Sequence, residues 1–172
     1  MKGGNFGSKP ARLLTDRQFL EFAFERVLRT SAKLCFEITE TAVIENRTVA
    51  MANIAELRMI GVKISIDDYG SGLSSVSYLK QIHADELKLD RSLVVALKST
   101  ERDRLVVKST IELAHSLDMT VVGEGIEDRE TMSVLENIGC DTIQGYLISK
   151  PFDLKALITM LGAEERPESL TA

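Results

Sequence analysis

The sequence predicts an α/β fold in which parallel strands alternate with helices. Five short apolar segments recur along the 172 residues, and segments with apolar side chains at helical spacing separate them. Strands that alternate with helices form a parallel sheet covered by helices. A complete eight-stranded barrel usually takes about 250 residues. Five strands in this length therefore leave two architectures, an open sheet or a barrel with a piece absent.

The first half of the chain contains two of these strands. Asp16 is placed to cap the first long helix, and Gly61 is placed to end the second. A turn with two aspartates and two glycines follows the second strand, at residues 67–72. The predicted helices are 15–29, 46–60 and 74–79, and the predicted strands are 34–38 and 62–66.

The second half continues the alternation with three more strands. Gly139 is placed to end one helix, and Asp153 is placed to cap the last. The predicted strands are 86–89, 120–122 and an irregular one at 142–148, and the predicted helices are 102–117, 129–138 and 153–161. We expect one domain over residues 15–163, a disordered or remnant segment at 1–14 and a flexible tail at 164–172.

The composition narrows the possible partners. A formal net charge of -5 argues against binding to a DNA or RNA polymer, which requires a basic surface. The negative charge still allows binding of a small anionic nucleotide, because a metal ion can supply positive charge. No apolar run is long enough for a membrane helix, and we expect no membrane insertion and a cytoplasmic location. Cys35 and Cys140 are expected to be buried free thiols in a reducing compartment.

Ionisable side chains gather where the predicted strands end. The carboxyl ends of parallel strands open onto one face, which carries the active site in such folds. We therefore expect these residues to converge, although more than half of the chain separates the first from the last. They are Glu37 on the first strand, Asp67 and Asp68 after the second, Lys88 and Asp90 at the third and Glu124 after the fourth, with Gln144 adding a polar group on the fifth.

The chemistry of this set favours a hard metal ion. Side chains alternate along a strand, so Lys88 should face the carboxylates while Leu87 and Leu89 face the helices. Carboxylates supply only oxygen ligands, which Mg²⁺ prefers and Mn²⁺ accepts. Each residue also has a purely structural interpretation: the aspartates can open a turn, Lys88 can reach solvent, and Asp90 can cap the turn at Ser92.

Five segments resemble the EAL phosphodiesterase family. They are FEITE at 36–40, IDDYGSGLSS at 66–75, LKLD at 87–90, GEGIE at 123–127 and QGY at 144–146. The resemblance implies a modified (β/α)8 barrel that hydrolyses cyclic di-GMP to pGpG with two Mg²⁺ or Mn²⁺ ions. It also suggests a homodimer formed through the barrel, and GGDEF or sensory domains in the parent protein.

The same resemblance implies a role for each matched residue. Lys88 would hold and help to activate the attacking water, and either Asp68 or Glu124 would act as the base. The other implied roles are a ligand of one metal for Glu37, a bridging ligand for Asp67, ligands of the second metal for Asp68 and Glu124, substrate binding or support for Asp90, Gln144 and Glu127, and a loop anchor for Glu40.

The sequence departs from the family at its beginning. No Glu-Ala-Leu tripeptide occurs, and the position of an expected asparagine ligand falls on Ser8, with Asn5 out of register. We therefore expect a barrel that is incomplete at its N-terminus and weak or inactive as an enzyme, because lost ligands weaken a metal site. Two alternatives stay open: a degenerate cyclic di-GMP receptor and a protein-interaction module.

Overall fold

A five-stranded parallel sheet forms the centre of the protein. The computed structural model describes residues 14–30, 33–39, 47–71 and 76–164. The strands lie side by side in chain order and are all parallel: β1 (Cys35–Thr39), β2 (Lys63–Tyr69), β3 (Glu86–Leu89), β4 (Thr120–Gly123) and β5 (Thr142–Ile143). A doubly wound sheet would reverse its strand order at a switch point. The sequential order instead matches part of a (β/α)8 barrel, which confirms the predicted fold class.

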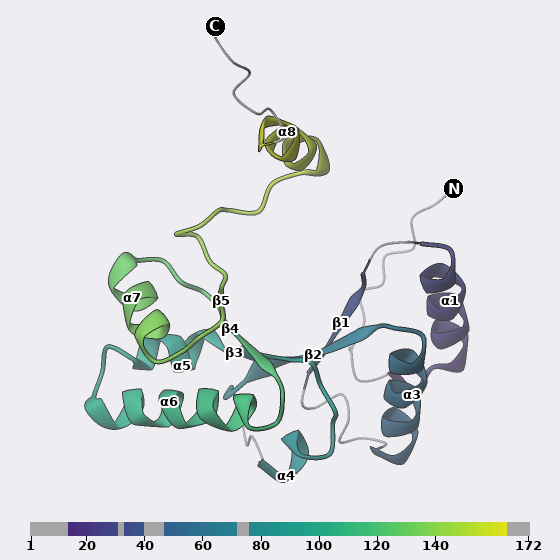
Figure 1. Cartoon of the computed structure of the whole chain (residues 1–172), viewed down its shortest axis with the longest axis horizontal. Helices are drawn as coiled ribbons and strands as arrows, with labels where there is room; N and C mark the ends of the chain where they lie inside the picture. Colours follow the sequence, from purple (N-terminus) through teal and green to yellow (C-terminus); the bar gives the residue numbers. More distant parts are fainter. Residues whose placement is uncertain (1–13, 31–32, 40–46, 72–75, 165–172) are drawn as a thin grey trace, which may run out of the picture.

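Helices separate the strands in sequence, and all the described helices except the last one flank the sheet in space (Figure 1). The described helices are α1 (Arg17–Leu28), α3 (Arg47–Met59), α4 (Val76–Leu79), α5 (Arg91–Ala96), α6 (Glu101–His115), α7 (Arg129–Asn137) and α8 (Leu154–Glu164). Five helices have a side-chain N-cap that accepts a hydrogen bond from a first-turn amide: Asp16, Asp90, Thr100, Asp128 and Asp153. Gly61 follows α3 with a φ of 86°, the left-handed conformation in which glycine commonly ends a helix.

The core lies between the sheet and these helices. Ile64, Ile66, Leu87 and Leu89 are completely buried, as expected for strands that helices cover. Burying one such side chain contributes roughly 1.5–3 kcal/mol. The helices supply the facing surface through fully buried residues, including Ala50, Leu57, Val107, Ala114 and Leu135.

Three local predictions were wrong. The fifth strand ends at Ile143 because Gly145 packs against the backbone of Ile126, and the chain then turns, with the Gly145 carbonyl accepting hydrogen bonds from the amides of Ile148 and Ser149. Strand β2 continues through the aspartates to Tyr69. Helix α5 was not predicted, since six residues are too few to show a helical period.

The cysteines were predicted only in part. Both are free thiols, as expected. Cys140 is partly buried, and its Sγ lies 3.5 Å from the Val121 carbonyl oxygen, which accepts its hydrogen bond. Cys35 is exposed, because it begins β1 at the edge of the described sheet.

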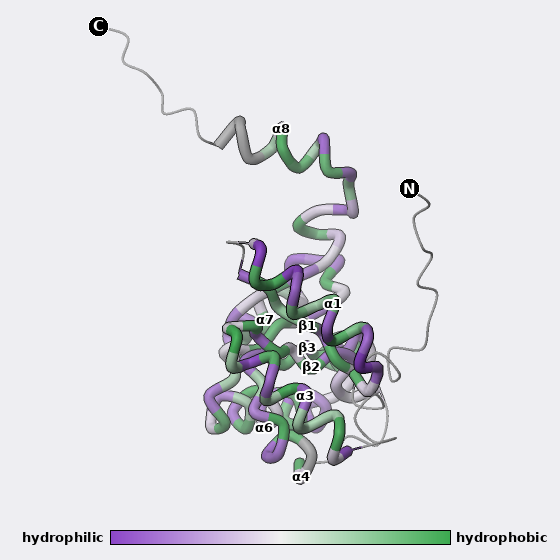
Figure 2. Tube along the Cα trace, turned by 90° about the vertical axis from the view of Figure 1, so that its right-hand side faces the viewer, coloured by the Kyte–Doolittle hydropathy of each residue, from purple (hydrophilic) through white to green (hydrophobic). Residues whose placement is uncertain are grey.

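The C-terminal helix stands apart from this body. Both views show α8 away from the sheet, and hydrophobic residues run along it (Figure 2). Every residue from Pro151 to Met160 is exposed. In the described part of the chain, no helix has the length and apolar character to cross a membrane. Of the segments predicted to be disordered or flexible, 1–13 and 165–172 lie outside the described residues, whereas Leu14 is buried and Glu164 ends α8.

Candidate metal centre

Lys88 is the centre of the ionisable cluster. It lies on β3 between two completely buried leucines and is itself 5% exposed. Its Nζ atom lies 2.7 Å from Glu124 Oε1, 2.9 Å from Asp67 Oδ1 and 3.1 Å from Glu37 Oε1. Burial disfavours its charge, but these contacts outweigh burial and hold the pKa of Lys88 above its ordinary value. The prediction that Lys88 faces the carboxylates is confirmed.

A bulge in β2 explains how two consecutive aspartates serve one site. Side chains in a regular strand point to opposite faces, which would separate Asp67 from Asp68. Here the register with β3 shifts between Ile66 and Tyr69, so β2 carries one extra residue. Asp68 adopts a φ of 56°, a left-handed conformation that aspartate tolerates better than most residues. The bulge therefore redirects the strand where the two carboxylates occur.

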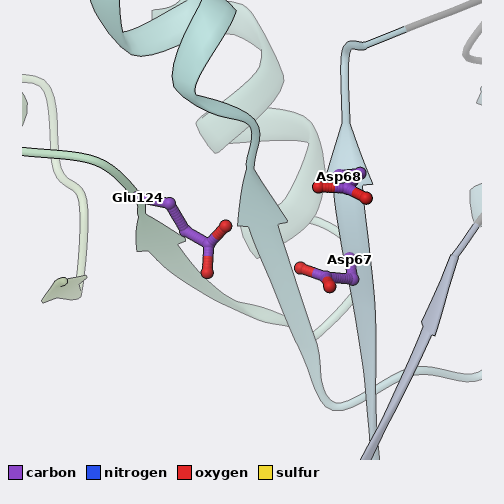
Figure 3. A group of neighbouring side chains, drawn as sticks. All are labelled: Asp67, Asp68 and Glu124. Atoms are coloured by element: carbon purple, nitrogen blue, oxygen red, sulfur yellow. The ribbon is translucent and has the colours of Figure 1, made fainter. Parts of the chain in front are cut away.

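Asp67, Asp68 and Glu124 form a compact group of carboxylates. One ligand atom from each lies within 4.8 Å of the others. Figure 3 shows Asp67 and Glu124 facing one another across the end of β3, with Asp68 farther along β2. Apart from its ion pair with Lys88, the buried Oδ1 of Asp67 has no hydrogen-bond donor among the described residues. An all-oxygen group with unused acceptor capacity fits a hard divalent cation.

The raised pKa of Asp68 also supports a cation site at this carboxylate group. Partial burial, followed by the negative charges of Asp67 and Asp90, raises the pKa of Asp68, and Lys88 opposes this only in part. The cluster therefore contains more negative charge than its lysine neutralises. A bound cation would relieve this repulsion.

A pocket opens beside the carboxylates. Its volume is about 250 Å³, and Glu124 belongs both to it and to the carboxylate group. The other lining residues come from the start of α5, the loop after β4 and the turn after β5: Arg91, Gly125, Glu127, Gln144, Gly145 and Tyr146. The pocket thus places polar side chains next to the cluster.

The remaining described residues of the predicted site lie outside the compact carboxylate group. Glu37 contacts Lys88, but its side chain is 56% exposed and it does not belong to the compact carboxylate group. Asp90 caps α5, with its Oδ1 accepting a hydrogen bond from the Ser92 amide at 2.9 Å. Gln144 is exposed at the pocket. Glu40, Asn5 and Ser8 lie outside the described residues.

Sequence reasoning missed Arg91. Its Nη2 lies 2.8 Å from Glu127 Oε1, and it lines the pocket together with Glu124. Its position directly after the LKLD segment was the only signal, because the pairing joins the start of α5 to the loop after β4, 36 residues farther along the chain. Neither histidine belongs to the carboxylate group or lines this pocket: His115 Nε2 lies 2.8 Å from Asp141 Oδ2, and the carbonyl oxygen of His83 accepts a hydrogen bond from Arg58.

Comparison with known proteins places the chain in a family. The sequence model of the EAL domain matches residues 9–151. This chain belongs to the EAL domain family. The described carboxylates, Lys88 and the pocket all lie within the matched range. The EAL resemblance expected from the five sequence segments is therefore confirmed.

Two curated relatives come from Pseudomonas aeruginosa. The chain is 36% identical over 141 residues to cyclic di-GMP phosphodiesterase NbdA, covering 82% of this chain and 18% of that protein. It is 34% identical over 125 residues to the bifunctional diguanylate cyclase/cyclic di-GMP phosphodiesterase MucR, covering 73% and 18%. The chain spans only 16 to 22% of the length of the first curated relatives it matches.

Solved structures agree with the family assignment. The EAL domain of Mycobacterium smegmatis DcpA is 34% identical and superposes with a TM-score of 0.81, covering 92% of this chain and 72% of that one. The PaMucR phosphodiesterase in complex with c-di-GMP is 31% identical with a TM-score of 0.78, covering 86% and 61%. The backbone arrangement of an EAL domain is thus present over most of the described chain.

Proposed function

We propose that this chain is part of a phosphodiesterase that hydrolyses cyclic di-GMP to the linear dinucleotide pGpG. The observation that carries the proposal is the convergence of the Lys88 ammonium with the carboxylates of Asp67 and Glu124. Family membership supports the same reaction, since relatives such as NbdA are named cyclic di-GMP phosphodiesterases. An acidic pocket is compatible with an anionic nucleotide only if cations are present, which leads to the metal proposal.

We propose that the carboxylate group holds Mg²⁺ or Mn²⁺ in a two-ion site. Asp67, Asp68 and Glu124 would be ligands, and Glu37 would be a further ligand of one ion. Their oxygen atoms suit these cations, and the unused acceptor capacity of Asp67 supports binding. When bound, the ions supply positive charge that neutralises the phosphodiester and favours ionisation of a water molecule.

The residues around this site would have separate roles in activating the water, accepting its proton and supporting the nucleotide. Lys88 lies among the proposed metal ligands, and its ammonium would hold and help to activate the attacking water as a hydrogen-bond donor when a bound cation takes over one of its carboxylate partners. The base would then be a carboxylate, either Asp68 or Glu124. Asp90 supports the site by capping α5, while Gln144 and Glu127 line the pocket in which part of the nucleotide would lie.

The proposal extends to the setting of the reaction. We propose a cytoplasmic location, which the two free thiols support because a reducing compartment preserves them. We keep residues 15–163 as the proposed domain. A homodimer and an attached GGDEF or sensory domain remain proposals, and the bifunctional name of the relative MucR supports the second.

The test is hydrolysis by the purified chain in Mg²⁺ or Mn²⁺, with pGpG measured by chromatography. Asp67→Asn and Lys88→Met should abolish turnover, whereas Lys108→Met should not, because Lys108 pairs with Glu112 within α6. Circular dichroism would check that each variant is folded. Weak turnover that both site variants lose would support the enzyme proposal, whereas binding of cyclic di-GMP without any turnover by the unaltered chain would make this chain a remnant or a receptor rather than a catalyst. Turnover that survives Asp67→Asn would remove the carboxylates from the mechanism.

A further inference from the structure

The loop between β4 and α7 carries Glu124 and is fixed at two backbone points. The Glu124 amide donates to the Leu89 carbonyl at 3.3 Å, and the Ile126 amide donates to the Gln144 carbonyl at 3.2 Å. Between them lies Gly125, with a φ of 69°. A glycine in this conformation follows the turn without steric cost, but it contributes no side chain to hold the turn in place. A third backbone bond, from the Leu147 amide to the Ile126 carbonyl at 3.0 Å, and the side chain of Arg91 restrain this segment further.

The aliphatic part of Arg91 covers Gly125. A β-carbon placed on this glycine would lie 2.8 Å from Arg91 Cγ and 3.0 Å from Arg91 Cδ, closer than carbon atoms normally approach. The arginine side chain therefore occupies the space above the glycine. Arg91 is itself anchored, because it is the first residue of α5, whose N-cap is Asp90 and whose Val94 is buried.

The guanidinium of Arg91 holds the other end of the same turn. Its Nη2 lies 2.8 Å from Glu127 Oε1, and the two side chains are 60% and 50% exposed. An exposed pair contributes little to global stability. Its effect is local, since the stem and the head of one side chain contact both sides of Ile126. A second ion pair connects the segment after α5 to the N-cap of α7, since Lys98 Nζ lies 2.8 Å from Asp128 Oδ2.

We propose that Arg91 is a positioning residue that fixes the turn at Gly125–Glu127 and thereby holds the Glu124 carboxylate at the metal site. The inference rests on the proposed function, because it assigns Glu124 to a metal ion. Glu124 directly precedes the turn, and its Oε1 lies 2.7 Å from Lys88 Nζ. A small displacement of the turn would move this oxygen away from Asp67 and Asp68.

Mn²⁺ binding, followed by electron paramagnetic resonance, tests the proposal without requiring activity. Arg91→Met keeps most of the stem above Gly125 and removes the ion pair, and Glu127→Gln removes the same pair from the other side. Each should weaken Mn²⁺ binding about tenfold, the low end of the loss seen when groups that orient metal ligands are removed, because the turn next to Glu124 loses a restraint. The double variant should be no weaker than either single variant, because both lose one interaction. Lys108→Met is the control, since it removes a comparable exposed pair within α6.

Hydrogen exchange of the Ile126 amide is the second readout, measured by NMR in the full chain without metal. Its exchange should accelerate in Arg91→Met and Glu127→Gln and stay unchanged in Lys108→Met. Unchanged exchange together with unchanged Mn²⁺ affinity would overturn the positioning role while leaving the metal site intact. Failure of the unaltered chain to bind Mn²⁺ would contradict the proposed function instead, and the exchange rates would still decide whether Arg91 holds the turn.

Discussion

The Nζ atom of Lys88 lies 2.7 Å from Oε1 of Glu124, at the carboxyl ends of two neighbouring strands. The same ammonium contacts Asp67 and Glu37, so one buried cation neutralises part of a strongly acidic cluster. Removing this ammonium should therefore destabilise the fold as well as the proposed site. The two roles can be separated by experiment, because only one of them depends on metal.

Replacing Lys88 with methionine should lower the free energy of unfolding by about 3 kcal/mol in EDTA, since it leaves partly buried carboxylates unpaired. Saturating Mg²⁺ should recover part of this loss, because a cation would then replace the ammonium charge. Urea denaturation with and without Mg²⁺ measures both effects. Equal destabilisation in both conditions would show that no metal ion binds near the lysine.

The pKa of Asp128 gives a pH-dependent prediction. Its contacts with Lys98 and then with the Thr131 amide lower this pKa from 3.8 to about 2. A folded-state pKa below the unfolded value stabilises the fold above about pH 4, and the contribution disappears as the pH falls toward 2. Asp128→Asn should therefore lower the urea midpoint at neutral pH and match the unaltered chain near pH 2. Glu136→Gln, in the same helix, is the control, and a difference that persists at low pH would rule out a charge effect.

Removing side-chain volume from the core of the sheet should strongly lower the free energy of unfolding. Ile64 is completely buried on β2, between β1 and β3. Ile64→Ala should cost about 2–5 kcal/mol, because it removes apolar contacts and leaves a cavity. Met59→Ala, at a position that is 79% exposed, should stay within about 0.5 kcal/mol. Thermal or urea unfolding would compare the two, and similar losses would contradict the buried position of Ile64.

Gly145 should not tolerate a side chain. A β-carbon there would lie 2.2 Å from the Ile126 carbonyl oxygen, and backbone atoms cannot move away as easily as a side chain. Gly145→Ala should cost about 1–3 kcal/mol and displace the turn that carries Gln144. Gly61→Ala is the matched comparison: it has open space around it, so its cost of about 1 kcal/mol should come only from its positive φ. Equal costs would show that the close approach at Gly145 is not required.

The sequence was most informative where a regular period applies. Strand alternation placed Lys88 toward the carboxylates, and parallel strand ends brought Glu124 to Asp67, as the structure confirms. The bulge at Asp68 was not predictable, because the extra residue appears only when β2 is paired with β3. Arg91 was missed for a related reason: its contacts with Gly125 and Glu127 depend on how the start of α5 packs on the loop after β4.

The order of the strands also determines when the site can form. Among the described strands, neighbours in the sheet are also neighbours in the chain, so this sheet can grow in one direction during synthesis. Glu37 and Asp67 would emerge from the ribosome first, and Lys88 would join them when β3 docks. The acidic loop at Glu124 would arrive only after this ammonium was in place. The ammonium of Lys88 would therefore be in place before Glu124, the last carboxylate, and it would offset part of the negative charge that Glu37 and the two aspartates had already brought together.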